Sequence, residues 1–296
     1  MSESIDPGVF REYVFAIADA ESAEYLPEGL VTERLTPKIL MSSAHLMPML
    51  IDLKRSPAGT RDALFDLVRH RGENTEPPPV AQFIKTNVSA AEISRHWNVM
   101  QLAQPQPGRK QWLRLHDPRV LHQLLRILNP MQRKKLFGLS FTFTYWIGGE
   151  WVIAQRGCAD RPQAQIGIDD GVQPYAGPAR WDWPRIERIG LVNRALHRAG
   201  IRHAEMLLSL GALAEQLMDR AAKRHRLAAQ NDLVEFATRG LMIHPAFDEH
   251  VEVAPLIKPA NTLADQSNLS DRLSLVEDHV WNELLRSEKI LNGNRL

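Results

Sequence analysis

Cysteine and long apolar runs are what this sequence has least of. A single cysteine, Cys158, stands among 296 residues, so the chain can form neither an internal disulfide nor a zinc site built from several thiolates. No apolar run approaches the ~20 residues of a membrane helix. The N-terminus, MSESIDPGVF, lacks the basic and then apolar pattern of a secretory signal. We therefore expect a soluble, cytoplasmic protein with no membrane partner.

An excess of charge of one sign is also missing. Lys and Arg together number 36 and Asp and Glu 35, for a net charge of +1, whereas proteins that wrap nucleic acid carry a strong basic excess. The composition is otherwise ordinary for a soluble globular protein, with 44% hydrophobic and 24% charged residues. A chain of this length is expected to form about two domains.

Local signals agree best in residues 111–138, QWLRLHDPRVLHQLLRILNPMQRKKLFG. Asp117 before Pro118 is typical of a helix start, because the carboxylate accepts from the first N–H groups and proline loses no hydrogen bond there. Asn129-Pro130 repeats this pattern, and Gly138 is placed to end the second helix in a left-handed turn. The first helix is expected to carry one apolar stripe, formed by Leu121, Leu124, Leu125 and Leu128.

The rest of residues 10–155 alternates between strand and helix patterns. Strands are expected at 13–18, 83–86, 111–115, 141–147 and 150–155, with Gly148-Gly149 as a hairpin signal between the last two. Helices are expected at 58–70 and after the capping-box pattern of Ser89 and Glu92, and a turn at 104–110. These patterns predict an α/β (α+β) N-terminal lobe, residues 10–155, with a mixed sheet.

The second half of the chain reads differently. Residues 156–182 have no sustained period and are rich in Pro and Gly, so we expect a linker there. Helical patterns then fill 183–292 and predict an all-α C-terminal lobe. Its longest helix is expected at 202–226, with an inward stripe of Met206, Leu210, Leu213 and Leu217. The later expected features are a helix that begins at Asn231 or Asp232 and closes at Gly240, a loop at 243–262, and a last helix that opens at Ser270.

Motifs that carry catalysis are scarce. The sequence has no HExxH, no P-loop and no GxSxG. His116-Asp117 has the order of the HD pair of metal phosphohydrolases, but a capping role explains Asp117 without a metal. His244, Asp248 and His250 have side chains that can ligate a metal. We expect instead a junction between helix and loop with exposed polar residues.

Basic residues gather in two places. Between Arg109 and Lys135 the chain carries eight Lys or Arg and one acid. The second run, 223–226, has the sequence KRHR and lies at an expected helix end. There we expect a solvated face favoured by the helix dipole, with phosphate binding as the alternative.

The block WLRLHDPRVLHQLL, followed by LFG and an aromatic strand with GGEW, resembles the N-terminal domain of type VI secretion effector adaptors, the Tap-type or Tec-type chaperones. Asp117, Pro118 and Arg119 match the DPR of that family, and His116 replaces a commoner aromatic residue. YVFAIADA is similar to the opening strand of the family, and NDLVEFATRGLMIHPAFDEH to its helical tail. The resemblance covers residues 13–155 well and 183–290 loosely.

The resemblance implies a protein without catalytic residues, metal or cofactor. Such adaptors bind a toxin effector in the cytoplasm and load it onto the valine-glycine repeat spike protein of the secretion machine. Asp117, Pro118 and Gly138 are then structural. The candidate partner contacts are the basic residues Arg114, Arg119, Arg133, Lys134, Lys223 and Arg224, with structural ion pairs as the other role for Arg114 and Arg119.

Two other functions stay open at this point. A metal-dependent phosphohydrolase would use His116, Asp117 and other histidines of the chain. A basic nucleic-acid-binding module would use the faces near Lys134 and Arg224, and its binding would weaken as salt is added.

Overall fold

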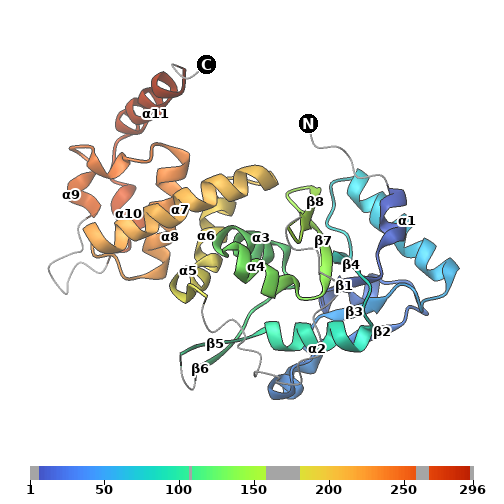
Figure 1. Ribbon diagram of the computed structural model, residues 1–296. Coiled ribbons are helices and arrows are strands. Elements are labelled where there is room, and N and C mark those ends of the chain that lie inside the picture. The colour runs from blue at the N-terminus through green and yellow to red at the C-terminus, as the bar shows by residue number, and fades with distance from the viewer. Residues whose placement is uncertain (1–6, 107–108, 158–180, 258–266, 294–296) are drawn as a thin grey trace. The chain divides into compact units, whose positions relative to one another are not determined.

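The computed structural model describes residues 7–106, 109–157, 181–257 and 267–293 (Figure 1). The chain divides into two compact units, Met1–Ile186 and Glu187–Leu296. The boundary falls inside helix α5 (Trp183–Glu187). Most of the linker expected at 156–182 lies outside the described residues.

The N-terminal unit is built on a six-stranded sheet with the order β2-β3-β1-β4-β7-β8. Every pairing in it is antiparallel, so the described strands include none of the parallel pairs that a mixed sheet would contain. β7 and β8 meet at Gly148 and Gly149, which have φ of 67° and 86° as a tight hairpin requires. The strands are β1 (Phe15–Ala18), β2 (Thr32–Arg34), β3 (Met49–Asp52), β4 (Val80–Thr86), β7 (Ser140–Ile147) and β8 (Glu150–Gln155).

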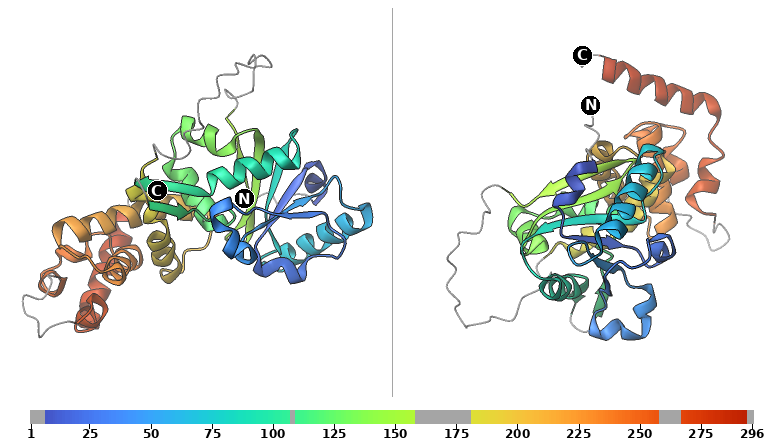
Figure 2. Two further views of the ribbon diagram at one scale, coloured as in Figure 1. Left: turned by 90° about the horizontal axis from the view of Figure 1, so that it is seen from below. Right: turned by 90° about the vertical axis from the view of Figure 1, so that its right-hand side faces the viewer.

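Helices cover both faces of this sheet, and α1 (Ala58–Glu73) and α2 (Ala90–Met100) lie on different sides of it (Figures 1 and 2). Side chains alternate between the faces of a strand. Phe83 of β4 points to the face that α1 covers and packs on Phe65 of that helix, with ring centroids 6.3 Å apart. Phe143 of β7 points to the other face, where it contacts Trp97 of α2 at 6.3 Å. Phe83 and Phe143 are thereby buried on opposite faces of the sheet.

The second face also carries α3 (Pro118–Ile127) and α4 (Pro130–Phe137). Phe137 at the end of α4 stacks on Phe143 at 4.4 Å, and His122 of α3 shares a 2.9 Å hydrogen bond with the hydroxyl of Tyr145. This unit also contains short 3-10 turns, at η1 (Pro7–Glu12), η2 (Glu21–Tyr25) and η3 (Lys38–Leu46).

Three helix starts follow the sequence prediction. Asp117 accepts a hydrogen bond from the backbone N–H of Arg119 at 3.0 Å and caps α3. Asn129 and Gln132 form a capping box at the start of α4. Ser89 and Glu92 form another at the start of α2. These caps depend only on neighbours in sequence, which is why the sequence predicted them.

A two-stranded hairpin replaces the turn that was expected at 104–110. β5 (Leu102–Gln106) pairs antiparallel with β6 (Arg109–Trp112), and the strand expected at 111–115 begins and ends earlier. Polar residues and Pro105 hid β5, because they lack the alternation of a half-buried strand.

The C-terminal unit is helical where it is described, so the predicted fold class is confirmed: an α+β unit is followed by an all-α unit. Its core is formed by α6, α7 and α8, which contact one another pairwise, and α10 packs on α8. The elements are α6 (Ile189–Arg198), α7 (Ala204–Arg224), α8 (Gln230–Met242), η6 (Phe247–Glu249), α9 (Ala254–Ile257), α10 (Leu269–Leu273) and α11 (Asp278–Gly293).

The stripe predicted for α7 was wrong in its phase. Met206 is 45% exposed, whereas Leu207, Ala214 and Met218 are buried. Of the predicted stripe, Leu217 is buried as expected. Leucines lie on more than one side of this helix, so spacing alone did not identify the inner side.

Several expected ends in this unit were also wrong. Gly240 lies inside α8 and does not end it, and a Cβ there would come within 2.7 Å of the Leu217 side chain. Asp232 does not cap α8 but accepts from the backbone N–H of Leu269 at 3.0 Å. The loop expected at 243–262 contains η6 and α9, and its last residues lie outside the described part. The last helix is divided into α10, capped by Asn268, and α11.

Candidate functional site

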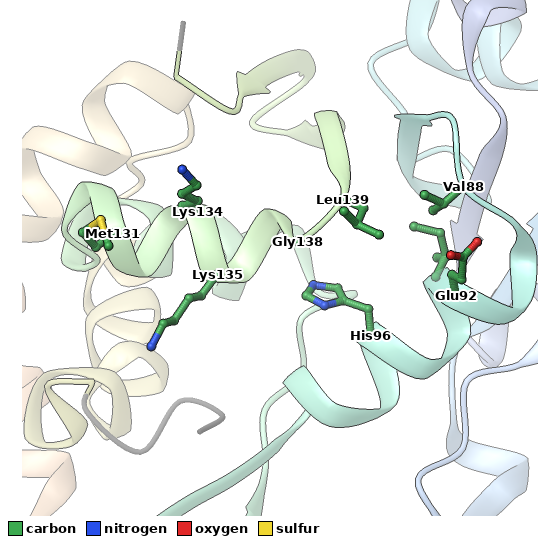
Figure 3. A pocket seen from close by; sticks show the side chains of 9 residues that line it. Val88, Glu92, His96, Met131, Lys134, Lys135, Gly138 and Leu139 are labelled. Atoms are coloured by element: carbon green, nitrogen blue, oxygen red, sulfur yellow. The ribbon is translucent and has the colours of Figure 1, made fainter. Parts of the chain in front are cut away.

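A groove of about 440 Å³ lies between α2 and α4 on the N-terminal unit (Figure 3). Its lining is mainly apolar. One wall comes from α2 and the residues before it: Val88, Glu92, Ile93 and His96. The other comes from α4 and the residues after it: Met131, Lys134, Lys135, Gly138 and Leu139.

The wall from α4 is the side of that helix that faces away from the core. Met131, Lys134, Lys135 and Gly138 recur at the spacing of one helical face, while Leu136 and Phe137 are buried. Met131 remains 68% exposed and Leu139, at the start of β7, 54% exposed. The groove therefore places large apolar side chains beside water, which is a feature of binding surfaces.

His96 joins the two walls of the groove. Its Nε2 donates to the backbone carbonyl of Leu136 at 2.9 Å, and its ring lies against Gly138 (Figure 3). A Cβ at residue 138 would come within 2.5 Å of this ring, and Gly138 has a φ of 57°. Burial lowers the pKa of His96, so the ring is neutral at neutral pH. Glycine is thus required twice, for the backbone conformation and for the close approach.

Charge is distributed unequally across the groove. Lys134 and Lys135 stand on the α4 wall, and α4 contains no acid. Glu92 stands on the α2 wall, where its carboxylate accepts from the backbone N–H of Ser89 at 2.9 Å and from its hydroxyl at 2.7 Å. These hydrogen bonds lower the pKa of Glu92. The acid is therefore engaged in the helix cap, and the α4 side of the groove is basic.

The DPR segment forms a compact turn. Arg119 binds the Asp117 carboxylate with two parallel hydrogen bonds, from Nε at 3.0 Å and from Nη2 at 2.8 Å. Burial alone would raise the pKa of Asp117, but the hydrogen bonds and charge of Arg119 bring it below its ordinary value. Both oxygens of this carboxylate are thus used within the turn. Asp117 has a structural role here, as the sequence predicted.

His116 is buried beside this turn. Its ring stacks on Trp112, with centroids 5.4 Å apart, and its Nε2 lies 3.8 Å from a carboxylate oxygen of Asp19. Burial lowers the pKa of His116 to about 4, against the attraction of Asp19. The described residues contain no group of three His, Cys, Asp or Glu side chains with the geometry of a metal site.

The other predicted partner-binding residues of the N-terminal unit are Arg114, Arg133 and Lys134, and they have different surroundings. Arg114 lies over the ring of Trp112, 5.9 Å from its centroid. Arg133 donates from Nε to the carbonyl of Leu128 at 3.0 Å. Of Arg114, Arg119, Arg133 and Lys134, only Lys134 lines the groove.

In the C-terminal unit, an ion cluster forms around the buried Asp248. The Asp248 side chain is buried, not exposed as the sequence was interpreted. Nη2 of Arg220 lies 2.8 Å from Oδ1, and Nε2 of His225 donates to Oδ2 at 2.8 Å. Nη1 of Arg224 is 3.9 Å from the same Oδ2 and 2.6 Å from Oε1 of Glu249. The signal that was missed is the pairing of the KRHR run with the acids of FDE.

The remaining candidates of this unit also have partners within the fold. Lys223 pairs with Asp219 at 3.3 Å. Nδ1 of His244 accepts from the backbone of Ala246, and Nδ1 of His250 from that of Glu252. The structure therefore does not bring His244, Asp248 and His250 together as metal ligands.

Sequence reasoning missed the apolar part of the groove. The sequence predicted the helix that carries Ile93, but Val88, Met131 and Leu139 were not singled out. Met131 lies within the basic stretch 109–135, and an apolar residue on the polar side of a short helix is the signal that could have marked it.

One comparison with known proteins finds a match. Residues 14–135 match the family model of a domain of unknown function, DUF4123. The match spans β1 to nearly the end of α4 and so includes the DPR turn and most of the groove. No curated protein and no solved structure matches the chain significantly. Within the described residues, no helix is both long enough and apolar enough to span a membrane.

Proposed function

We propose that the protein is a cytoplasmic adaptor that binds a toxin effector of a type VI secretion system and loads it onto the valine-glycine repeat spike protein. The observation that carries this proposal is the DUF4123 match over residues 14–135. It covers the block WLRLHDPRVLHQLL, the stretch whose resemblance to the effector adaptors is most specific.

The surface of the N-terminal unit supports a protein-binding role. Protein interfaces combine an apolar centre with a polar rim, and methionine is used where a surface must adapt to a partner. The groove has both features, with Met131 and Leu139 exposed and Lys134 and Lys135 beside them.

The alternative of a phosphohydrolase is less well supported by the same geometry. Arg119 donates hydrogen bonds to both carboxylate oxygens of Asp117, and the His116 ring is buried and stacked on Trp112. We therefore propose no catalytic residue, metal or cofactor. Metal analysis of the purified protein tests this choice, because a stoichiometric transition metal that is lost in Asp117→Asn would favour the enzyme.

Co-expression tests the proposed function directly. The tagged chain is produced together with the products of its neighbouring genes, and retained proteins are identified by mass spectrometry. We expect a multidomain toxin, a spike protein or both to be retained at moderate salt. A chain that arrives alone, although the neighbouring products are soluble and abundant, contradicts the proposal. Retention of nucleic acid that is lost as salt rises would favour the nucleic-acid alternative.

A further inference from the structure

We propose that the protein forms a symmetric dimer in which β8 pairs antiparallel with β8 of a second copy, so that Ile153 lies opposite its own counterpart. The six-stranded sheets of the two copies then continue into one another across the dimer axis. This inference goes beyond the proposed function and does not depend on it, because it concerns an edge of the sheet and not a contact with an effector.

The outer edge of β8 carries unpaired backbone groups. β8 stands last in the strand order, and among the described strands it pairs with β7 alone. Hydrogen bonds alternate along an antiparallel pair, and the N–H of Arg156 donates to the carbonyl of Phe141 at 2.9 Å. By this alternation, the N–H and C=O groups of Trp151, Ile153 and Gln155 point away from β7. Nothing in the described part of the chain bonds to them, so this edge can accept another strand.

The two edges of this sheet differ in their protection against pairing. Natural sheets protect an edge with a short strand, charges, proline or a bulge. At the far edge, β2 has three residues, of which Glu33 and Arg34 are charged. β8 has six residues, keeps a regular register along β7, and bears no charge or proline between Trp151 and Gln155. Of these two edges only β8 is suited to pairing, so an assembly through it closes at two copies.

The chemistry of the edge determines the form of the occupant. Free amides and carbonyls in a row require an extended strand, because a helix satisfies its own backbone. Ile153, in the middle of the edge, is 45% exposed, so the incoming strand should bring an apolar side chain beside it. A charge brought there would lose water without gaining an ion pair. The occupant is therefore an uncharged strand with a free edge of its own.

A second β8 meets each of these requirements. With the two-fold axis at Ile153, Trp151 lies opposite Gln155 of the second copy, and Val152 lies opposite Ala154. The backbone groups that point outward then form about six hydrogen bonds, and no like charges oppose each other over this stretch. One contact pairs the free edges of both copies, as in the two-fold dimers that are the commonest oligomers.

The mass of the full-length chain in solution is the first test. Ile153→Lys places two like charges face to face at the axis, where their repulsion opposes association. Ile39→Lys is the matched control, because Ile39 is 47% exposed in η3 and lies outside β8. We expect the wild type and the control to have twice the mass of one chain, and Ile153→Lys to raise the dissociation constant of the dimer at least about tenfold. Size-exclusion chromatography with light scattering at several concentrations measures this, and circular dichroism establishes that the variants are folded.

Cysteine cross-linking tests the register. The variants are made in a Cys158→Ser background, because Cys158 is the single cysteine. The Cα atoms of a hydrogen-bonded pair lie about 5.5 Å apart, which a disulfide can span, whereas diagonal neighbours are about 7–8 Å apart. Val152 is a diagonal neighbour of its own counterpart in this register. With oxidised glutathione, we therefore expect Ile153→Cys chains to become linked at least about tenfold faster than Val152→Cys chains.

Amide hydrogen exchange identifies what covers the edge. In the wild-type dimer the N–H groups of Trp151, Ile153 and Gln155 should exchange slowly, and in the Ile153→Lys monomer they should exchange fast. Slow exchange in that monomer would show that the edge is covered within the chain, and it would overturn the inference.

The other outcomes decide as clearly. A wild type that is monomeric at every concentration overturns the inference, and so does a dimer that Ile153→Lys leaves intact or that Val152→Cys links faster. Protection of the β8 amides only in the presence of a co-expressed protein would show a strand of that protein as the occupant, which also overturns it. Retention of an effector or spike protein is measured separately, so either proposal can fail while the other stands.

Discussion

Two short basic runs end helices in this protein, and they have different surroundings. Arg133-Lys134-Lys135 closes α4, and Lys223-Arg224-His225 closes α7. The second run faces acids of its own unit: Lys223 pairs with Asp219, Arg224 with Glu249, and His225 with the buried Asp248. The first run borders a mainly apolar groove, which Lys134 and Lys135 help to line. Equal charge in the sequence therefore supports the packing of one unit and a candidate docking surface on the other.

Removing the buried acid is the strongest way to test this comparison. Asp248→Asn keeps the shape of the side chain but leaves Arg220 and His225 without their anion. Breaking a buried ion pair costs about 3–5 kcal/mol. We expect about 3 kcal/mol here, because the Arg220 side chain is still 29% exposed and can reach water. Urea unfolding followed by far-ultraviolet circular dichroism measures this loss.

Glu249→Gln is the matched control for Asp248→Asn. Its carboxylate pairs with Arg224 at the surface, where water and salt screen the interaction, so the free energy of unfolding should hardly change. If Glu249→Gln lowers the free energy of unfolding as much as Asp248→Asn does, pairing with the buried Asp248 is not the main contribution of the second run to stability.

A residue with a positive φ near the end of each run gives a smaller effect on stability. Gly138 ends α4 with a φ of 57°, and Arg226 follows α7 with a φ of 56°. Gly138→Ala adds a Cβ within 2.5 Å of the His96 ring in a conformation that L residues rarely adopt, so we expect a cost of about 1–3 kcal/mol. Arg226→Gly relieves backbone strain in the folded state but raises the conformational entropy of the unfolded chain. These two effects on the free energy of unfolding should offset each other to within about 1 kcal/mol.

Denaturant titration of both variants measures this difference. Gly149→Ala is a control in the same unit as Gly138, because its φ is also positive, at 86°, but a Cβ there would meet no atom within 4 Å. If Gly138→Ala costs no more than Gly149→Ala, the contact with His96 adds nothing to the requirement for glycine.

The same pair of runs shows how far the sequence could be interpreted. The caps at Asp117, Asn129 and Ser89 were predicted because each cap and its N–H partner lie within three residues. The contact between His96 and the end of α4 joins residues that are far apart in the sequence: His96 and Leu136 are separated by 40 positions. No local sequence pattern could therefore reveal it. The groove could not be predicted for the same reason.

The errors in the C-terminal unit have a related cause. Asp248 was interpreted as exposed because charged residues are seldom buried unless they are paired. Its partner Arg220 lies in α7 and its partner His225 directly follows α7, so α8 separates both from Asp248 in the chain. The phase of α7 was wrong because Met206, Leu207 and Leu208 stand side by side in the sequence, and only packing decided that Leu207 is the buried one.

Replacing one lysine in each run should have the smallest effect on stability, but it compares the roles of the two runs in binding most directly. Lys134 and Lys223 are both exposed, so Lys134→Ala and Lys223→Ala should each leave the unfolding midpoint almost unchanged, as substitutions at exposed ion-pair positions usually do. Binding of the labelled partner protein that co-expression retains should respond differently, since a charge at the rim of an interface chiefly alters the association rate and its salt dependence. Lys134→Ala should slow association at low salt and flatten the dependence on salt, and Lys223→Ala should do neither. Stopped-flow anisotropy at several salt concentrations measures both, and equal responses of the two variants would mean that the run on α4 differs from the run on α7 in its neighbours alone.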